Sequence, residues 1–224
     1  MTLSPLGDTA VVLALGHEMD EATIMRVRAL TAALEHNLPA GVTDIVPAFT
    51  SVTVFYDLAQ VGSYEQLCAE LRTWAGRAAS RPPFEMGRLV EIPVCYGDEF
   101  GPDLGEVAAH ANLSAAEIVA LHSGAEYRVH AIGFVPGFPY LGGLPAKLHT
   151  PRRATPRTQV PAGAVGIGGA QTGVYPLATP GGWNLIGRTP LALFRAQETP
   201  PTLLRMGDRV KFQPITAKEF VAWK

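Results

Sequence analysis

One stretch decides the fold of the second half of this chain: Gly133-Phe134-Val135-Pro136-Gly137-Phe138-Pro139-Tyr140-Leu141-Gly142-Gly143-Leu144. Glycine permits positive φ and proline fixes φ, so the alternation predicts stiff, shaped turns between aromatic side chains. The surroundings share this composition, since residues 131–190 hold 12 of the 23 glycines and 9 of the 19 prolines. Such stiffness suits a preorganised pocket, although Phe134 and Phe138 could equally belong to the core of a barrel.

Short apolar runs separate these turns, at 165–167, 183–186, 191–194 and 209–212. Many short strands between glycine- and proline-rich turns are typical of an all-β barrel with long loops. Before the loops, two short helices are expected at 103–111 and 115–121. Ser114 and Glu117 form a capping box for the second helix, and Gly124 ends it.

The first 80 residues alternate between strands and helices. We expect a strand at 9–15, a helix capped by Asp20 and ending near 36, and a hairpin of 42–48 with 51–57. A second helix begins after Ser63, which forms a capping-box pattern with Gln66. This β-α-β-β-α order becomes ferredoxin-like if the run 89–94 is its last strand, but that run could also begin the next domain.

The chain is therefore predicted to be an α+β protein of two domains. The N-terminal α/β domain, expected to be ferredoxin-like, covers residues 1–82, and a β-barrel domain covers 83–224. The boundary is placed at Ala78-Ala79-Ser80-Arg81-Pro82-Pro83, where the pattern changes.

Composition and missing motifs exclude several classes of function. The 224 residues are 47% hydrophobic, with neither a membrane-spanning apolar run nor the features of a signal peptide. Cys68 and Cys95 are expected to be buried thiols in the cytoplasm, a single disulfide being the alternative. No phosphate-binding loop, complete dinucleotide fingerprint, His-Glu-x-x-His or Gly-x-Ser-x-Gly occurs, and no metal site is expected.

Charge is distributed unevenly. No Asp or Glu lies between Glu126 and Glu198, so that stretch carries +7 and the rest of the chain −9. A positive electrostatic field attracts an anionic ligand. Most of the basic residues here are arginines, which can bind a carboxylate or phosphate through two N–H groups at once. Arginines dispersed over the surface are the alternative. Nucleic acid is disfavoured because the basic residues are not densely clustered.

Three loops supply the candidate site residues. The loop at 151–158 has three arginines that cannot all lie in a core, so at least one is expected to meet an anion unless the loop is simply solvated. The loop at 168–176 offers backbone N–H groups beside polar side chains, a set that could bind a small polar group or an oxyanion. His122 is the candidate general acid or base, with a surface or capping role as the alternative. The candidate substrate-binding residues are Arg152, Arg153, Arg157, Gln171, Thr172, Tyr175, Trp183 and Arg188.

Together these motifs resemble the KipI/PxpB family, also called allophanate hydrolase subunit 1. The resemblance is carried by residues 133–138, 151–153, 160–163, 171–176, 180–183 and 186–190, and by 6–10 near the N-terminus. It implies an N-terminal α/β domain followed by a cyclophilin-like β-barrel. It also implies a 5-oxoprolinase subunit, acting with a PxpC/KipA-type subunit and a PxpA-type component to open 5-oxo-L-proline to L-glutamate with ATP.

The resemblance leaves other functions open. The KipI branch inhibits a histidine kinase, and related domains occur beside urea-processing carboxylases, so a non-catalytic regulator or a subunit acting on allophanate or another urea derivative are the alternatives. The chain alone is expected to be inactive, and the subunit that binds ATP is not assigned. Our hypothesis is that Arg152, Arg157 and Arg188 hold the anionic groups while the 171–175 loop contacts the lactam.

Overall fold

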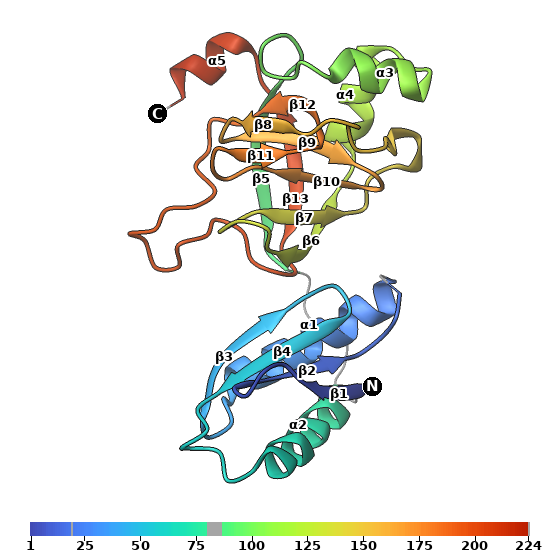
Figure 1. The fold of residues 1–224 in the computed structure, drawn as a ribbon. Coiled ribbons are helices and arrows are strands. Elements are labelled where there is room, and N and C mark those ends of the chain that lie inside the picture. Colours follow the sequence, from blue (N-terminus) through green and yellow to red (C-terminus); the bar gives the residue numbers. More distant parts are fainter. Residues whose placement is uncertain (19, 80–86, 224) are drawn as a thin grey trace. The chain divides into compact units, whose positions relative to one another are not determined.

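The computed structural model describes residues 1–18, 20–79 and 87–223. The chain divides into two compact units, residues 1–85 and 86–224 (Figure 1). The boundary expected between residues 82 and 83 lies outside the described residues.

The first unit is an antiparallel sheet with the strand order β1-β2-β4-β3. Helices α1 and α2 pack against each other, and α1 also packs against β3 and β4. Alternate residues of β4 (Val52, Val54 and Tyr56) are buried, as expected for a sheet covered on one face. The elements are β1 (Thr2–Pro5), β2 (Ala10–Ala14), α1 (Glu21–His36), β3 (Val42–Pro47), β4 (Ser51–Tyr56) and α2 (Tyr64–Ala79).

The local expectations for this unit are confirmed. The Asp20 carboxylate accepts a hydrogen bond from the Thr23 N–H at 2.6 Å and so caps α1. At the start of α2, the Ser63 hydroxyl accepts from the Gln66 N–H at 3.2 Å. The predicted apolar face of α1 is buried, consisting of Ile24, Val27, Leu30 and Leu34.

The ferredoxin-like arrangement predicted for this domain is not confirmed. The run 89–94 lies in β5 (Leu89–Tyr96), which belongs to the barrel, so the alternative that it begins the next domain is the correct one. Ile92 and Val94 are buried in the barrel core, which explains why this strand does not pair with β2. The edge beside β2 is filled instead by β1.

The second unit is a closed barrel with the strand order β10-β7-β6-β13-β5-β12-β9, which confirms the predicted β-barrel. β13 pairs with β5 in parallel, and the other barrel pairs are antiparallel. Helices α3, α4 and α5 gather on one side of the barrel, at the top of Figure 1. Besides β5, the elements are α3 (Leu104–Ala111), α4 (Ala115–Gly124), β6 (Tyr127–Ile132), β7 (Pro139–Gly142), the 3₁₀ turn η1 (Ala146–Leu148), β8 (Arg157–Val160), β9 (Ala164–Gly168), β10 (Gln171–Val174), β11 (Thr179–Gly181), β12 (Asn184–Arg188), β13 (Arg209–Pro214) and α5 (Ala217–Ala222).

Two sequence predictions in this unit had different outcomes. The capping box of α4 is present, because Ser114 Oγ accepts from the Glu117 N–H and the Glu117 carboxylate accepts from the Ser114 N–H at 2.8 Å. The run 191–194, in contrast, is not a strand. It forms an isolated bridge between Phe194 and Thr202, both outside the named strands, and Leu193 is buried in the barrel core.

Candidate functional site

Three glycines on the outer wall of the barrel make a floor for the Trp183 indole. A Cβ atom at Gly168 would lie 2.6 Å from the Trp183 ring, and one at Gly166 or Gly173 would lie 3.1 Å from the Trp183 side chain. Gly166 pairs with Gly173 across β9 and β10, so both face the same side of the sheet. These glycines are therefore required by the close approach of an indole ring.

An aromatic cluster extends from Trp183. Phe138 contacts Trp183 and Tyr175 edge to face, with centroids 5.4 and 5.1 Å apart. Tyr140 lies against both Phe138 and Trp183. Phe138 is buried in a core cluster separate from the barrel core. Phe134 is 59% exposed at a φ of +68°, so the alternative of a core position is wrong for Phe134, whereas the buried Phe138 is a core residue of this unit.

Arg152 and Gln171 lie on the same side of the sheet as this cluster. The Arg152 guanidinium is 6.0 Å from the centroid of the Trp183 ring, a cation–π contact, and the residue is exposed. Gln171 pairs directly with Gly168, so its side chain projects from the face on which Trp183 lies. An exposed guanidinium thus lies against the buried indole, and a partly exposed amide lies on the same face of the sheet.

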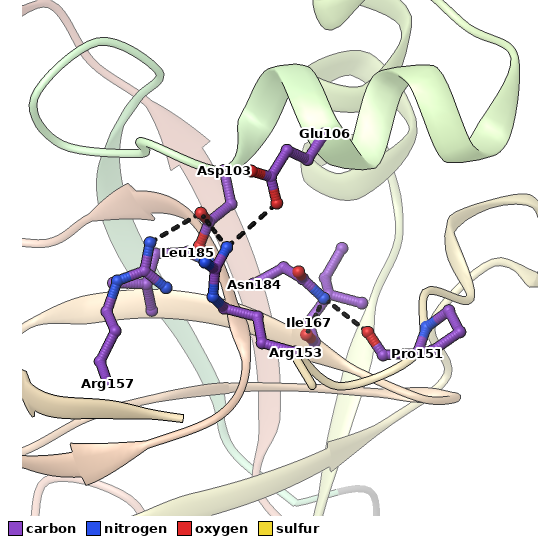
Figure 2. A network of polar contacts seen from close by, with 8 residues as sticks. All are labelled: Asp103, Glu106, Pro151, Arg153, Arg157, Ile167, Asn184 and Leu185. Atoms are coloured by element: carbon purple, nitrogen blue, oxygen red, sulfur yellow. Dashed lines mark hydrogen bonds and ion pairs between the residues drawn. The ribbon is translucent and has the colours of Figure 1, made fainter. Parts of the chain in front are cut away.

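The other two loop arginines are bound by a carboxylate from outside their own segment. Arg153 Nη1 and Arg157 Nη2 both donate to Asp103 Oδ1, at 2.9 and 2.7 Å, and Arg153 Nη1 also pairs with Glu106 at 3.0 Å (Figure 2). The second oxygen, Asp103 Oδ2, accepts from the buried Leu185 N–H at 2.7 Å. Asp103, with a side chain only 3% exposed, joins the start of α3 to β12 and to the arginine loop.

This network corrects the interpretation of the charge pattern. Arg153 and Arg157 are not unpaired cations, because Asp103, an acidic residue upstream of the basic stretch, forms an ion pair with each of them. The hydrogen bond and charge of Asp103 raise the pKa of Arg157 above its ordinary value, although burial acts the other way. Sequence reasoning missed Asp103, which lies at the N-cap position of α3 but makes no capping hydrogen bond with its side chain.

Tyr175 connects the arginines to the aromatic cluster. Burial raises the pKa of its hydroxyl, while the hydrogen bond from the Trp183 backbone and the charges of Arg152 and Arg157 act in the opposite direction. The charges of both guanidinium groups therefore act on the hydroxyl.

Thr172 and His122 lie elsewhere, inside the barrel. The His122 ring is fully buried, with Nδ1 2.8 Å from the Tyr96 hydroxyl and Nε2 3.0 Å from the Thr172 hydroxyl. Thr172 also donates to the Gly166 carbonyl. Burial lowers the pKa of His122 to about 3. The alternative of a surface or capping role for His122 is therefore wrong. Because both ring nitrogens are hydrogen-bonded within the core, a substrate cannot contact the ring.

Arg188 shares none of the contacts described above for the loop arginines Arg152, Arg153 and Arg157. Its Nε donates to the Ala162 carbonyl at 2.9 Å, and its guanidinium is 6.0 Å from the ring centroid of Phe220 in α5. The structure thus brings together five of the predicted residues, with Gln171 at their edge. We call them the arginine–aromatic site: Arg152, Arg153, Arg157, Tyr175 and Trp183.

The arginine–aromatic site can attract an oxyanion, but its Trp183 and Tyr175 rings are buried. The carboxylates that the described residues bring to it, Asp103 and Glu106, are paired with arginines. Within residues 1–18, 20–79 and 87–223, no three His, Cys, Asp or Glu side chains converge as a metal site would need. None of the helices in the described part of the chain has both the length and the apolar character to cross a bilayer.

Comparison with known proteins agrees with this architecture. Residues 1–204 match the family described as carboxyltransferase domain, subdomain C and D. The chain is 47% identical to the B-type subunit of the 5-oxoprolinase of Bacillus subtilis, covering 99% of this chain and 96% of that protein. It is 49% identical to the B-type subunit of the 5-oxoprolinase of Escherichia coli O157:H7, covering 93% and 94%. The crystal structure of a conserved uncharacterized protein from Pyrococcus horikoshii superposes with a TM-score of 0.59 at 43% identity, covering 98% and 100%.

Matches of this identity over nearly the whole chain establish the family. The chain belongs to the carboxyltransferase subdomain C and D family and, as its loop motifs predicted, to the KipI/PxpB group of B-type 5-oxoprolinase subunits.

Proposed function

We propose that this chain is the B-type subunit of a cytoplasmic, ATP-dependent 5-oxoprolinase complex that opens 5-oxo-L-proline to L-glutamate. The observation that carries the proposal is the nearly full-length similarity to two proteins named as B-type subunits of 5-oxoprolinase, at 47% and 49% identity. The partners are a PxpC/KipA-type subunit and a PxpA-type component, and the chain alone is inactive. Its two cysteines are both buried and form no disulfide, which suits a reducing compartment.

The arginine–aromatic site fits the shape and charge of this substrate. 5-Oxoproline is a small ring with one carboxylate and one lactam group. Arg152, beside Arg153 and Arg157, can attract the carboxylate, the partly exposed Tyr140 can pack on the ring, and the Gln171 amide can hydrogen-bond the lactam. This assignment keeps Arg152 from the sequence-based hypothesis but moves Arg188 and Thr172 out of the site.

ATP does not fit the glycine-rich segment of this chain. A phosphate cradle needs exposed backbone N–H groups, whereas the Trp183 side chain covers Gly166 and Gly168. We therefore assign ATP binding to a partner subunit, and the residues of this chain bind and orient the substrate.

Reconstitution tests the proposal. The chain is co-purified with its PxpC/KipA-type subunit, the PxpA-type component is added, and glutamate formed from 5-oxoproline and ATP is measured with each component omitted in turn. We expect product only when all components are present. Arg152→Gln should raise the KM for 5-oxoproline about ten-fold, whereas Arg195→Gln, which removes an exposed pair with Glu198, should leave it unchanged.

A stable complex without turnover of 5-oxoproline would refute the proposal. The same complex would then be assayed with allophanate and with other urea derivatives, and the chain alone with a histidine kinase. These experiments correspond to the two alternatives that the family resemblance leaves open.

A further inference from the structure

Two buried arginine donors in the arginine–aromatic site have no acceptor among the described residues. They are Arg153 Nε and Arg157 Nη1. Buried N–H groups in proteins are almost always hydrogen-bonded, and an unpaired donor on a charged group is more costly than one on a neutral group. Two such donors on neighbouring side chains therefore point to a shared acceptor.

The Asp103 carboxylate fixes where these donors lie. Because Arg153 and Arg157 both donate to Asp103 Oδ1, their guanidinium groups meet at one oxygen atom. Figure 2 shows both groups below Asp103, on the side away from the helix that carries Glu106. Each arginine thus uses one nitrogen for the protein's own carboxylate and keeps another buried nitrogen that has no acceptor among the described residues.

The charge balance favours an anion as the shared acceptor. Asp103 neutralises one of the two arginines, and Glu106, whose side chain is 66% exposed, pairs with Arg153 only. Arg152 adds a further positive charge that, like Arg157, acts on the Tyr175 hydroxyl. A neutral acceptor would leave this field uncompensated in a partly buried place, whereas an oxyanion compensates it.

We propose that Arg153 Nε and Arg157 Nη1 form a binding site for one oxyanion, a carboxylate or a phosphate, of a small acidic ligand. Asp103 acts as the positioning residue that holds the two guanidinium groups together. The inference deepens the proposed function, on which the identity of the ligand rests, because 5-oxoproline supplies a carboxylate and a phosphorylated intermediate would supply a phosphate. Binding of a simple anion can be tested without that function.

The test follows the Arg153 Nε–H signal of the full chain by NMR during titration with inorganic phosphate, and separately with acetate. Sodium chloride at matched ionic strength is the control for screening. We expect a saturable shift with phosphate or acetate that chloride does not produce. The anion that binds more tightly identifies the ligand group as a phosphate or a carboxylate.

Two variants complete the test. Arg157→Lys keeps the charge that pairs with Asp103 but loses the planar fork, so anion affinity should fall about ten-fold or more. Arg195→Lys changes an exposed arginine in the same unit and should bind as the wild type does. Arg153→Lys, followed through the Arg157 Nε–H signal, should also weaken binding, and unchanged melting temperatures of Arg153→Lys and Arg157→Lys would show that the loss is not a folding defect.

Two results would overturn the inference: no saturable shift of Arg153 Nε–H with either anion, or unchanged affinity in Arg157→Lys. The first would mean that water alone satisfies the donors. The proposed function fails separately, when the reconstituted complex does not open 5-oxoproline although the chain binds an oxyanion. Conversely, turnover with unchanged KM in Arg157→Lys would leave the reaction in place and remove this site from it.

Discussion

Removing the Asp103 carboxylate should destabilise the barrel unit more than any single surface change nearby. The Asp103→Ala substitution deprives Arg153 and Arg157 of their shared acceptor and leaves the Leu185 N–H buried without a partner. Glu106→Gln is the matched control, because it removes a carboxylate from the same network at an exposed position.

The structure sets the magnitude. Leaving the Leu185 N–H unpaired costs about 1–3 kcal/mol. Breaking a fully buried ion pair costs about 3–5 kcal/mol, but the Arg153 and Arg157 side chains are 29% and 25% exposed, so water replaces part of the loss. We expect Asp103→Ala to lower the free energy of unfolding by about 3 kcal/mol, and Asp103→Asn, which keeps one acceptor oxygen, by about half as much. Glu106→Gln should change it by about 0.5 kcal/mol or less.

Amide hydrogen exchange measures both the local and the global effect. Exchange at Leu185 reports the lost hydrogen bond, and exchange at Ile92 and Phe212, both in the barrel core, reports unfolding of the unit. Asp103→Ala should speed exchange at all three sites roughly a hundred-fold. Exchange within about three-fold of the Glu106→Gln rates would show that the arginines do not depend on Asp103, and the assignment of Asp103 as the positioning residue would be wrong.

Two further substitutions test the burial of His122 and the glycine floor. Burial lowers the pKa of His122 from 6.5 to about 3, so below pH 6.5 the unfolded chain binds a proton that the folded barrel excludes. Stability should fall as the pH drops from 6.5 toward 3, by at most about 1.4 kcal/mol per pH unit; in urea unfolding His122→Gln should remove this contribution, and the exposed His110→Gln should not. Gly168→Ala places a Cβ against the Trp183 ring and should cost about 1–3 kcal/mol with a changed near-ultraviolet circular dichroism spectrum. Gly105→Ala adds a Cβ in open space in α3, so it should stabilise the protein by about 0.5–1 kcal/mol and leave the spectrum unchanged. Equal effects of Gly168→Ala and Gly105→Ala on stability would show that Trp183 does not require a glycine at position 168.

The parts of the fold that follow from local physics could be predicted from the sequence. The caps at Asp20 and Ser114 and the apolar face of α1 depend on residues three or four positions apart, and all are confirmed. The assignment of 89–94 depended on pairing with a strand more than a hundred residues away, since β5 pairs in parallel with β13. An apolar run does not encode its partner, which is why two alternatives stayed open for it.

For the candidate site, too, the local features could be predicted from the sequence and the long-range pairing could not. Proline, glycine and arginine marked the loops correctly, and the structure brings Arg152, Arg153 and Arg157 near Trp183 and Tyr175. Composition could not reveal which arginines were already paired, because their carboxylate comes from about fifty residues upstream. Nor could it reveal that Gly166 and Gly168 lie against an indole ring.

The way Asp103 pairs with the arginines bears on how the chain can bind an anion. A guanidinium group has five N–H donors, so one carboxylate oxygen that accepts a single bond from each of two arginines fixes their positions without exhausting their donors. Fully paired arginines would have no affinity left for a ligand, and unpaired ones would repel each other in a partly buried site. The pairing with Asp103 is intermediate between these two cases. The carboxylate offsets the repulsion between the arginines, while the N–H groups of Arg153 Nε and Arg157 Nη1 have no acceptor among the described residues. The internal carboxylate, which at first argues against an anion site in this loop, is therefore what allows two guanidinium groups to share one.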